Sequence, residues 1–291
     1  METRKAKKKF PLIPVIVALM FLGGALVFLY PTISNYLASI NSSRISNDYM
    51  EAAALLDAKA IAWEKQKAIE YNEALLGDPV RDPFVDGSGM ALPQNYLDVL
   101  NIDGIMCTVE VPKVHIKLPV LHGTSKEVLD TAVGHIRQSA VPIGGIGNHP
   151  LLTGHTGLSN VKLFTDLVKV EKDDIFIIRV LQDTLYYKVD EISIILPDEI
   201  SKLEPIKDKD CVTLITCTPY AVNSHRLLVR GVRAEPTEEE LADLHRKPSL
   251  WMWIRDNSAL IVVLMCVLLL SVALLIYKKA RRGKGGGKGE S

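Results

Sequence analysis

Two long apolar segments without a single charge stand near the ends of the chain, at residues 11–30 and 259–277. As helices, each would extend about 30 Å, which is the thickness of the hydrocarbon core of a bilayer. A cleavable signal peptide is the alternative for the first segment, but its apolar run is too long and no small-x-small cleavage site follows it. The pattern therefore predicts a transmembrane helix at each end of the chain.

Apolar residues also recur within residues 44–76, a stretch rich in Ala, Leu, Glu and Lys that is expected to form a helix. It belongs to an N-terminal helical segment, 31–76. One narrow stripe repeats every seven residues, at Ala54, Ile61, Ala68 and Leu75. Because the positions between them are not consistently apolar, the stripe indicates a helix packed on a domain surface rather than a coiled coil.

Residues 93–235 change to short alternating and β-branched runs, which are typical of strands. Turns punctuate these runs and few helical patterns separate them, so a mainly β domain is expected, either a barrel or a sandwich. The predicted strands lie within 104–123, 174–180, 185–196, 211–217 and 226–234.

Three shorter helical stretches accompany the predicted β domain. Residues 124–136 have Thr124 as a candidate cap and Glu127 to complete a capping box, and residues 160–170 form another helical turn. The juxtamembrane residues 236–258 begin as an acidic helix and end beside the second apolar segment with Trp251 and Trp253, as interfacial aromatics do.

Residues 77–92 interrupt the helical and β regions with two Asp-Pro steps and several glycines, a composition that predicts a loop. At its centre, Asp82-Pro83-Phe84 places an aromatic ring beside a carboxylate. Local sequence alone favours a simple turn whose Phe84 packs into the core.

Charge places the two ends of the chain on one side of a membrane. Residues 1–10 and 278–291 are strongly basic, and basic flanks of membrane helices stay in the cytoplasm. Residues 31–258 are then expected on the extracellular face. The whole chain is formally neutral, but the two ends carry eleven basic residues and two glutamates. The part between them therefore has 23 basic and 32 acidic residues. An acidic middle argues against nucleic acid as a partner.

Four cysteines raise the question of a catalytic thiol. Cys266 lies in the second apolar segment as filler. Cys107 and Cys211 either pair or remain separate buried thiols, and the sequence leaves both possibilities open. Cys217 ends the apolar run TLITC, and Arg226 follows nine residues later. Local sequence alone favours a buried core thiol for Cys217. No CxxC pair, HExxH motif or phosphate-binding glycine motif is present, so neither a metal nor an organic cofactor is expected.

A cysteine nucleophile needs a histidine or another cation nearby, because its thiol is mostly protonated at neutral pH. Of the seven histidines, His155 is the strongest candidate. It stands between two glycines after an apolar pair, in LLTGHTG, where the end of a strand lets a ligand approach the backbone. His122 and His135 are the next candidates.

These residues together resemble a known family. TLITC is similar to the TLxTC signature of sortases, the membrane-anchored cysteine transpeptidases of Gram-positive bacteria, and His155 and Arg226 match the family's histidine and arginine. LLTGHTGLSNVKLFTDL resembles the class C, pilin-polymerising branch, as do Asp82-Pro83-Phe84 and the second apolar segment. The resemblance covers roughly residues 45–280. Thr156 departs from it, since class C members often have arginine after the histidine.

The resemblance implies a sortase-type closed β-barrel with short flanking helices. It implies that Cys217 is the nucleophile, His155 the acid and base, Arg226 the group that stabilises the oxyanion, and Thr216 a substrate-binding residue. The reaction it implies is cleavage of an LPxTG-like sorting signal between Thr and Gly, followed by transfer of the thioester to a lysine of another pilin subunit. Pilins and membrane lipid would be the partners.

The resemblance also changes the interpretation of residues 77–92, which it makes a lid. Asp82 would pair with Arg226, and Phe84 would cover the Cys217 sulfur. The nearest alternative function is a sortase that anchors proteins to the amine of a peptidoglycan precursor. An L,D-transpeptidase or papain-like hydrolase would not require Arg226 at this spacing, and a non-enzymatic membrane scaffold would not require Cys217.

Overall fold

The computed structural model describes residues 12–75, 95–158 and 161–244, together with 261–262, 264–268 and 271. The chain divides into two units, 35–246 and 1–34 with 247–291. In the second of these units the described residues are helical. Neither transmembrane prediction finds support here, because no helix among the described residues combines the length and the apolarity needed to cross a membrane.

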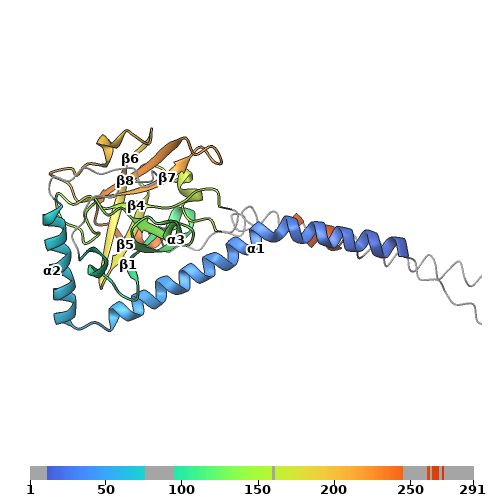
Figure 1. Cartoon of the computed structure of the whole chain (residues 1–291), viewed down its shortest axis with the longest axis horizontal. Coiled ribbons are helices and arrows are strands. Elements are labelled where there is room, and N and C mark those ends of the chain that lie inside the picture. The colour runs from blue at the N-terminus through green and yellow to red at the C-terminus, as the bar shows by residue number, and fades with distance from the viewer. Residues whose placement is uncertain are drawn as a thin grey trace, which may run out of the picture. The chain divides into compact units, whose positions relative to one another are not determined.

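Eight strands of the unit 35–246 close into a barrel in the order β1-β2-β3-β4-β7-β8-β6-β5 (Figure 1). The pairs β2–β3 and β4–β7 are parallel, and all other neighbours are antiparallel. The strands are β1 Ile105–Val111, β2 Ile116–His122, β3 Val133–His135, β4 Leu151–Thr153, β5 Ile175–Val180, β6 Asp183–Ile195, β7 Cys211–Thr218 and β8 His225–Arg233. The mainly β prediction is confirmed, as a barrel rather than a sandwich.

The strands of the barrel bury apolar residues on both faces. Leu152, Leu214 and Val229 belong to the large central cluster. Their sequence neighbours point to the opposite face, because side chains alternate along a strand. These neighbours, Leu151, Ile215 and Leu228, belong to a smaller second cluster, called here the outer cluster. Its members are Ile136, Leu151, Ile195, Leu203, Ile215 and Leu228.

The helix predicted over 44–76 is two helices, α1 (Leu12–Ala54) and α2 (Ala58–Ala74), and Figure 1 shows α2 beside the barrel. Asp57 starts the second helix, since its carboxylate accepts a hydrogen bond from the amide of Ala60 at 2.7 Å. The side-chain amide of Gln182 donates to three backbone carbonyls in the last turn of α1 and just beyond it. The hydrogen bonds of Gln182 therefore stabilise the end of α1, and the hydrogen bond of Asp57 stabilises the start of α2.

The predicted apolar stripe holds along α2 and fails at its start. Ile61, Ala68 and Leu75 pack against the central cluster, whereas Ala54 is exposed. Tyr71 adds to the buried face, and its hydroxyl donates to the backbone carbonyl of Arg137. The helix therefore packs on the domain, as predicted.

The prediction of a helix over 124–136 is wrong beyond the first turn. Only α3 (Lys126–Leu129) is helical, with Ser125 rather than Thr124 at the N-cap and no side-chain capping hydrogen bond. The chain then enters β3, where a β-carbon at Gly134 would collide with the carbonyl oxygen of Gly123. Glycine at this position lets β3 approach close to the end of β2, so tertiary pairing prevails over local helical propensity.

The remaining helical segments are short. The turn predicted over 160–170 is the 3-10 helix η3 (Thr165–Lys169), and the acidic helix after the barrel is α4 (Glu238–Leu244). Three further 3-10 helices are η1 Tyr96–Asp98, η2 Pro112–Val114 and η4 Ile200–Leu203. The predicted lid, 77–92, lies outside the described residues.

Candidate functional site

The β7–β8 pairing brings Cys217 and Arg226 together. They are direct partners in the antiparallel ladder, and the next pair is Thr218 with His225. Side chains of directly opposite residues lie on the same face of a sheet, with β-carbons about 5 Å apart. The nine-residue spacing therefore places the thiol and the guanidinium side by side, at the ends of the two strands joined by the loop 219–224.

His155 reaches the same level through the parallel pairing of β4 with β7. Thr153 is the register partner of Ile215, so the residues two positions further along each strand are His155 and Cys217. The amide of Gly154 donates to the carbonyl of Ile215 at 3.1 Å, which extends the pairing to the residue before the histidine. Alternation places His155 on the face that also carries Cys217. The structure thus gathers all three predicted catalytic residues at one end of the adjacent strands β4, β7 and β8.

The outer cluster lies on the face that carries these three residues. Leu151 precedes His155 by four residues, Ile215 precedes Cys217 by two, and Leu228 follows Arg226 by two. Leu203 of η4 packs on this cluster from the β6–β7 connection. The three candidate catalytic residues therefore lie at the edge of a buried apolar cluster.

Arg226 is held in place by the backbone of its own loop. Arg226 is only 8% exposed. Its Nη1 donates to the backbone carbonyls of Asn223 at 3.1 Å and His225 at 3.3 Å. The loop is itself folded tightly, with Ala221 and Asn223 at positive φ and the amide of Asn223 donating to the carbonyl of Pro219. These contacts orient the planar guanidinium before any substrate is bound.

The substrate-binding role of Thr216 stays a prediction, and the structure shows what its hydroxyl contacts. Its side chain is 2% exposed, and its hydroxyl donates to the carbonyl oxygen of Gly154 at 2.7 Å. Gly154 directly precedes His155, so this hydrogen bond attaches the histidine loop to β7. The geometry gives Thr216 a positioning role.

Replacing Thr216 by valine is expected to lower kcat roughly tenfold and leave KM nearly unchanged. Valine has the same shape but cannot donate to Gly154, so the His155 loop loses a support that costs about 1 kcal/mol of stability. Steady-state kinetics and thermal unfolding measure the two effects. Thr213→Val is the matched control, because its hydroxyl bonds the ring of His149 at the start of the same strand. An equal kcat loss in both variants would contradict the positioning role.

The other two cysteines of the unit 35–246 are unsuited to nucleophilic chemistry. Cys107 and Cys211 are unpaired thiols, so the disulfide left open by the sequence is absent. Burial raises the pKa of Cys107 far above its ordinary value and that of Cys211 to about 11. Neither supplies an appreciable thiolate near neutral pH.

The rival histidines are committed to structural hydrogen bonds. His135 is fully buried, its Nε2 donates to the carbonyl of Ala140 at 2.8 Å, and its Nδ1 accepts from the hydroxyl of Tyr96 at 2.9 Å. Burial lowers the pKa of His135 to about 4. His122 bonds the carbonyl of Val99 through Nε2 at 2.8 Å. His122 lies in β2 and His135 in β3, whereas β7, which carries Cys217, pairs with β4 and β8.

Two charged residues that the sequence did not single out act on His155. Burial lowers the pKa of the His155 imidazole, the Asp130 carboxylate opposes this by raising it, and the Lys126 ammonium lowers it further. Both residues belong to α3 and the turn after it. The only sequence signal for them is their four-residue spacing, which predicts a helix ion pair and no catalytic role.

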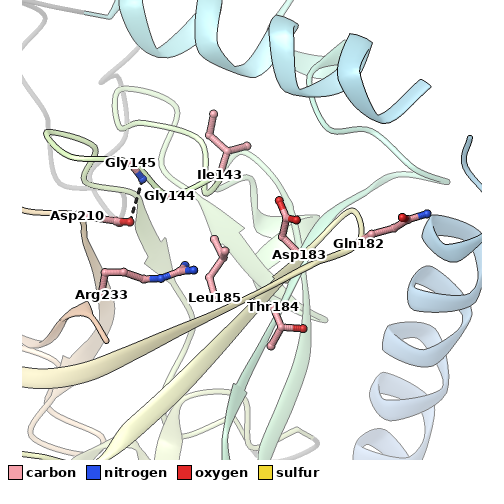
Figure 2. Close-up of a pocket in the computed structure, with 9 residues that line it drawn as sticks. All are labelled: Ile143, Gly144, Gly145, Gln182, Asp183, Thr184, Leu185, Asp210 and Arg233. Carbon is pink, nitrogen blue, oxygen red and sulfur yellow. Dashed lines mark hydrogen bonds between the residues drawn. The ribbon is translucent and has the colours of Figure 1, made fainter. Parts of the chain in front are cut away.

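A separate pocket of about 650 Å³ lies at the other end of the barrel, where β7 begins and β8 ends (Figure 2). Its polar groups bind one another or neighbouring elements. Asp210 accepts hydrogen bonds from the amide of Gly145 at 2.9 Å and from the hydroxyl of Tyr187 at 3.0 Å, and Asp183 pairs with Lys65. No thiol or imidazole lines it. Within the described part of the chain, no group of three or more His, Cys, Asp or Glu side chains is placed to hold a metal ion.

The three predicted lid residues, Asp82, Pro83 and Phe84, lie outside the described residues. Their contacts with Arg226 and Cys217 remain predictions.

Comparison with known proteins identifies the family. A sortase domain model matches residues 109–234, which include all three candidate catalytic residues. Sortase A of Bacillus anthracis is 30% identical over 154 residues, which cover 51% of this chain and 70% of that protein. The chain belongs to the sortase family. The barrel described above is therefore a sortase domain.

Solved sortase structures resemble this one closely. Sortase C-1 from Actinomyces oris is 41% identical with a TM-score of 0.59, and the match covers 61% of this chain and 99% of that one. The pilus-related sortase C of Group B Streptococcus is 36% identical with a TM-score of 0.61, covering 65% of this chain and 97% of that one. These matches confirm the predicted sortase-type barrel.

Proposed function

We propose that this sortase is a class C transpeptidase that joins pilin subunits covalently. The observation that carries the proposal is the shared position of Cys217, His155 and Arg226 at one end of β4, β7 and β8. Similarity to the sortase C structures, one of them described as pilus-related, supports the class. The His155 loop sequence and the Asp82-Pro83-Phe84 motif support it independently.

The first half of the reaction forms a thioester. Because burial lowers the pKa of His155, its imidazole is mostly neutral near pH 7 and can accept the thiol proton of Cys217. The thiolate attacks the carbonyl carbon between Thr and Gly of an LPxTG-like signal. Arg226 stabilises the negative oxygen that develops, and the imidazolium of His155 protonates the leaving glycine amine as the C–N bond breaks.

The second half of the reaction conserves the acyl bond energy. A lysine ε-amine of another pilin subunit attacks the thioester, and neutral His155 accepts the proton that the amine loses. The C–S bond breaks and an isopeptide bond forms. The imidazolium of His155 then returns its proton to the departing Cys217 thiolate, which restores both groups. The residues of this chain perform each step with no metal or organic cofactor in any role.

The outer cluster supports the strand ends that carry the site. It lies on the face that carries the thiol and is buried, with Leu203 of η4 packed in it. The scissile bond of a sorting signal would have to reach the thiol at the end of β7. The lid, with Asp82 on Arg226 and Phe84 over Cys217, and a location on the extracellular face of the cell membrane belong to the same proposal and rest on sequence pattern.

The decisive experiment mixes the purified full-length protein with candidate pilins and analyses the products. Ladders that resist SDS, with a threonine–lysine isopeptide identified by mass spectrometry, are the expected result. Transfer only to an amine of a peptidoglycan precursor would instead establish a cell-wall-anchoring sortase. No covalent product from either acceptor would contradict a transpeptidase and favour a scaffold.

A further inference from the structure

The side chain of Tyr220 connects the two loops that carry the catalytic groups. Tyr220 belongs to the β7–β8 loop, 219–224, which begins directly after the strand of Cys217. Gly157 follows His155 by two residues in the other loop. A β-carbon on Gly157 would lie 3.3 Å from Cε2 of the Tyr220 ring and 3.6 Å from both Cδ2 and Cζ. One edge of the aromatic ring therefore packs on the backbone of the histidine loop.

The conformation of the histidine loop depends on glycine at position 157. Its φ of +80° lies in the left-handed region, where other residues are strained, and a methyl group there would press on the Tyr220 ring. The amide of Gly157 donates to the hydroxyl of Thr165 at 3.1 Å, and the amide of Phe164 donates to the carbonyl of His155 at 3.2 Å. The segment that leads into η3 thus supports this loop on one side, and the Tyr220 ring supports it on another.

The β7–β8 loop is a firm support for the ring. The amides of Val222 and Asn223 both donate to the carbonyl of Pro219, at 3.1 and 2.9 Å. The carbonyl of Asn223 in turn orients the guanidinium of Arg226. Tyr220 is 65% exposed, so its ring adds little to the core of the domain. The contact with the histidine loop is therefore the main contribution that this side chain makes to the fold.

We propose that Tyr220 is a positioning residue that holds the His155 loop at the correct distance from Cys217. Proton transfer needs the imidazole and the thiol within hydrogen-bond reach, and a displacement of about 1 Å can cost roughly 100-fold in rate. Before the histidine, Thr216 and Ile215 attach the loop to β7. Tyr220 supplies an attachment after the histidine. The inference rests on the proposed acid–base role of His155.

The first test measures single-turnover thioester formation by the full-length protein in detergent, over a range of concentrations of an LPxTG-like peptide. Tyr220→Ala is expected to lower the maximal rate about five- to tenfold and to leave the half-saturating peptide concentration within a factor of about two. Tyr220→Phe keeps the ring and should retain the parent rate within the same factor. Val222→Ala is the control, because Val222 is 69% exposed in the same loop, and should also retain it.

The second test is a double-mutant cycle with Gly157→Ala. In the parent, the added methyl group strains the backbone and presses on the ring, whereas in Tyr220→Ala only the backbone strain remains. Gly157→Ala should therefore lower the acylation rate and the melting temperature less in Tyr220→Ala than in the parent. Gly104→Ala is the matched control for strain, with φ at +86° and no described atom within 4 Å of the new methyl group. Its effect on the melting temperature should be equal in both backgrounds.

Three outcomes would overturn the proposal. A higher half-saturating peptide concentration in Tyr220→Ala, with an unchanged maximal rate, would show that Tyr220 binds the peptide. An equal loss of rate in Tyr220→Phe and Tyr220→Ala would assign the effect to the hydroxyl. Additive effects of Tyr220→Ala and Gly157→Ala on the melting temperature would show that the ring does not support the loop. Melting temperatures do not depend on turnover, so an active His155→Gln enzyme would refute the proposed function separately.

Discussion

Replacing Cys217 by alanine is expected to abolish thioester formation with an LPxTG-like peptide. The reaction passes through a covalent bond to this sulfur, so its removal leaves no nucleophile at the end of β7. Loss of a catalytic nucleophile typically costs 10⁴-fold or more in kcat, so the expected activity is below detection. Intact-protein mass spectrometry after incubation with peptide measures the acyl-enzyme directly.

The other buried thiols provide matched controls for this prediction. Cys107→Ala and Cys211→Ala remove the same atom from the same unit, but burial keeps the pKa of both thiols high. Both variants should still form the acyl-enzyme, with some loss of thermal stability because each side chain is fully buried. Acyl-enzyme in Cys217→Ala, or its loss in both controls, would refute the assignment of the nucleophile.

The longer strands could be predicted from local pattern, whereas the short ones could not. β1, β2 and β5 to β8 each contain six or more residues with enough β-branched or alternating positions to be recognised. β3 and β4 have three residues each. Their pairing depends on Gly134 and on partners far along the chain. Residues 124–136, which include β3, were therefore predicted as a helix, and of β4 only its end before His155 was expected. A three-residue strand carries too little periodicity to be distinguished from a turn.

The site shows the same division. Cys217 and Arg226 could be placed together because a nine-residue spacing allows an antiparallel hairpin. The position of His155 beside them depends on a parallel β4–β7 pairing, for which no local signal exists. Its place between two glycines at the end of an apolar run ranked it above His122 and His135, and the family resemblance then supported that choice. The hydrogen bond from Thr216 to Gly154 could not be predicted, because adjacency to the thiol in sequence does not indicate which face a side chain takes. Asp130 was missed because its effect acts through space.

Replacing Arg226 by either alanine or lysine is expected to lower kcat about 10²- to 10³-fold. Alanine removes the cation that faces the developing oxyanion. Lysine keeps a charge but lacks the planar fork, so bonding both loop carbonyls would leave one N–H donor on the same nitrogen, where the guanidinium leaves three in a fixed plane. Single-turnover acylation with a sorting-signal peptide measures the step in which the oxyanion forms.

The matched control for Arg226→Lys is Arg230→Lys, four residues along the same strand. Arg230 makes two hydrogen bonds to Asp190, at 2.9 and 2.7 Å, away from the thiol. Its substitution should lower thermal stability and leave the acylation rate within a factor of about two. An equal loss of acylation in both variants would show that β8 had been disturbed generally.

The division of the Arg226 effect between kcat and KM identifies what the guanidinium does. A group that binds only the oxyanion contributes to the transition state and not to the bound peptide, so kcat falls while KM stays constant. A group that holds the peptide raises KM when it is lost. The hydrogen bonds from Nη1 to Asn223 and His225 fix the guanidinium before substrate arrives, which favours the first outcome. If Arg226→Lys keeps more than half of the parent kcat, charge alone is sufficient and the orientation by the loop is irrelevant to catalysis.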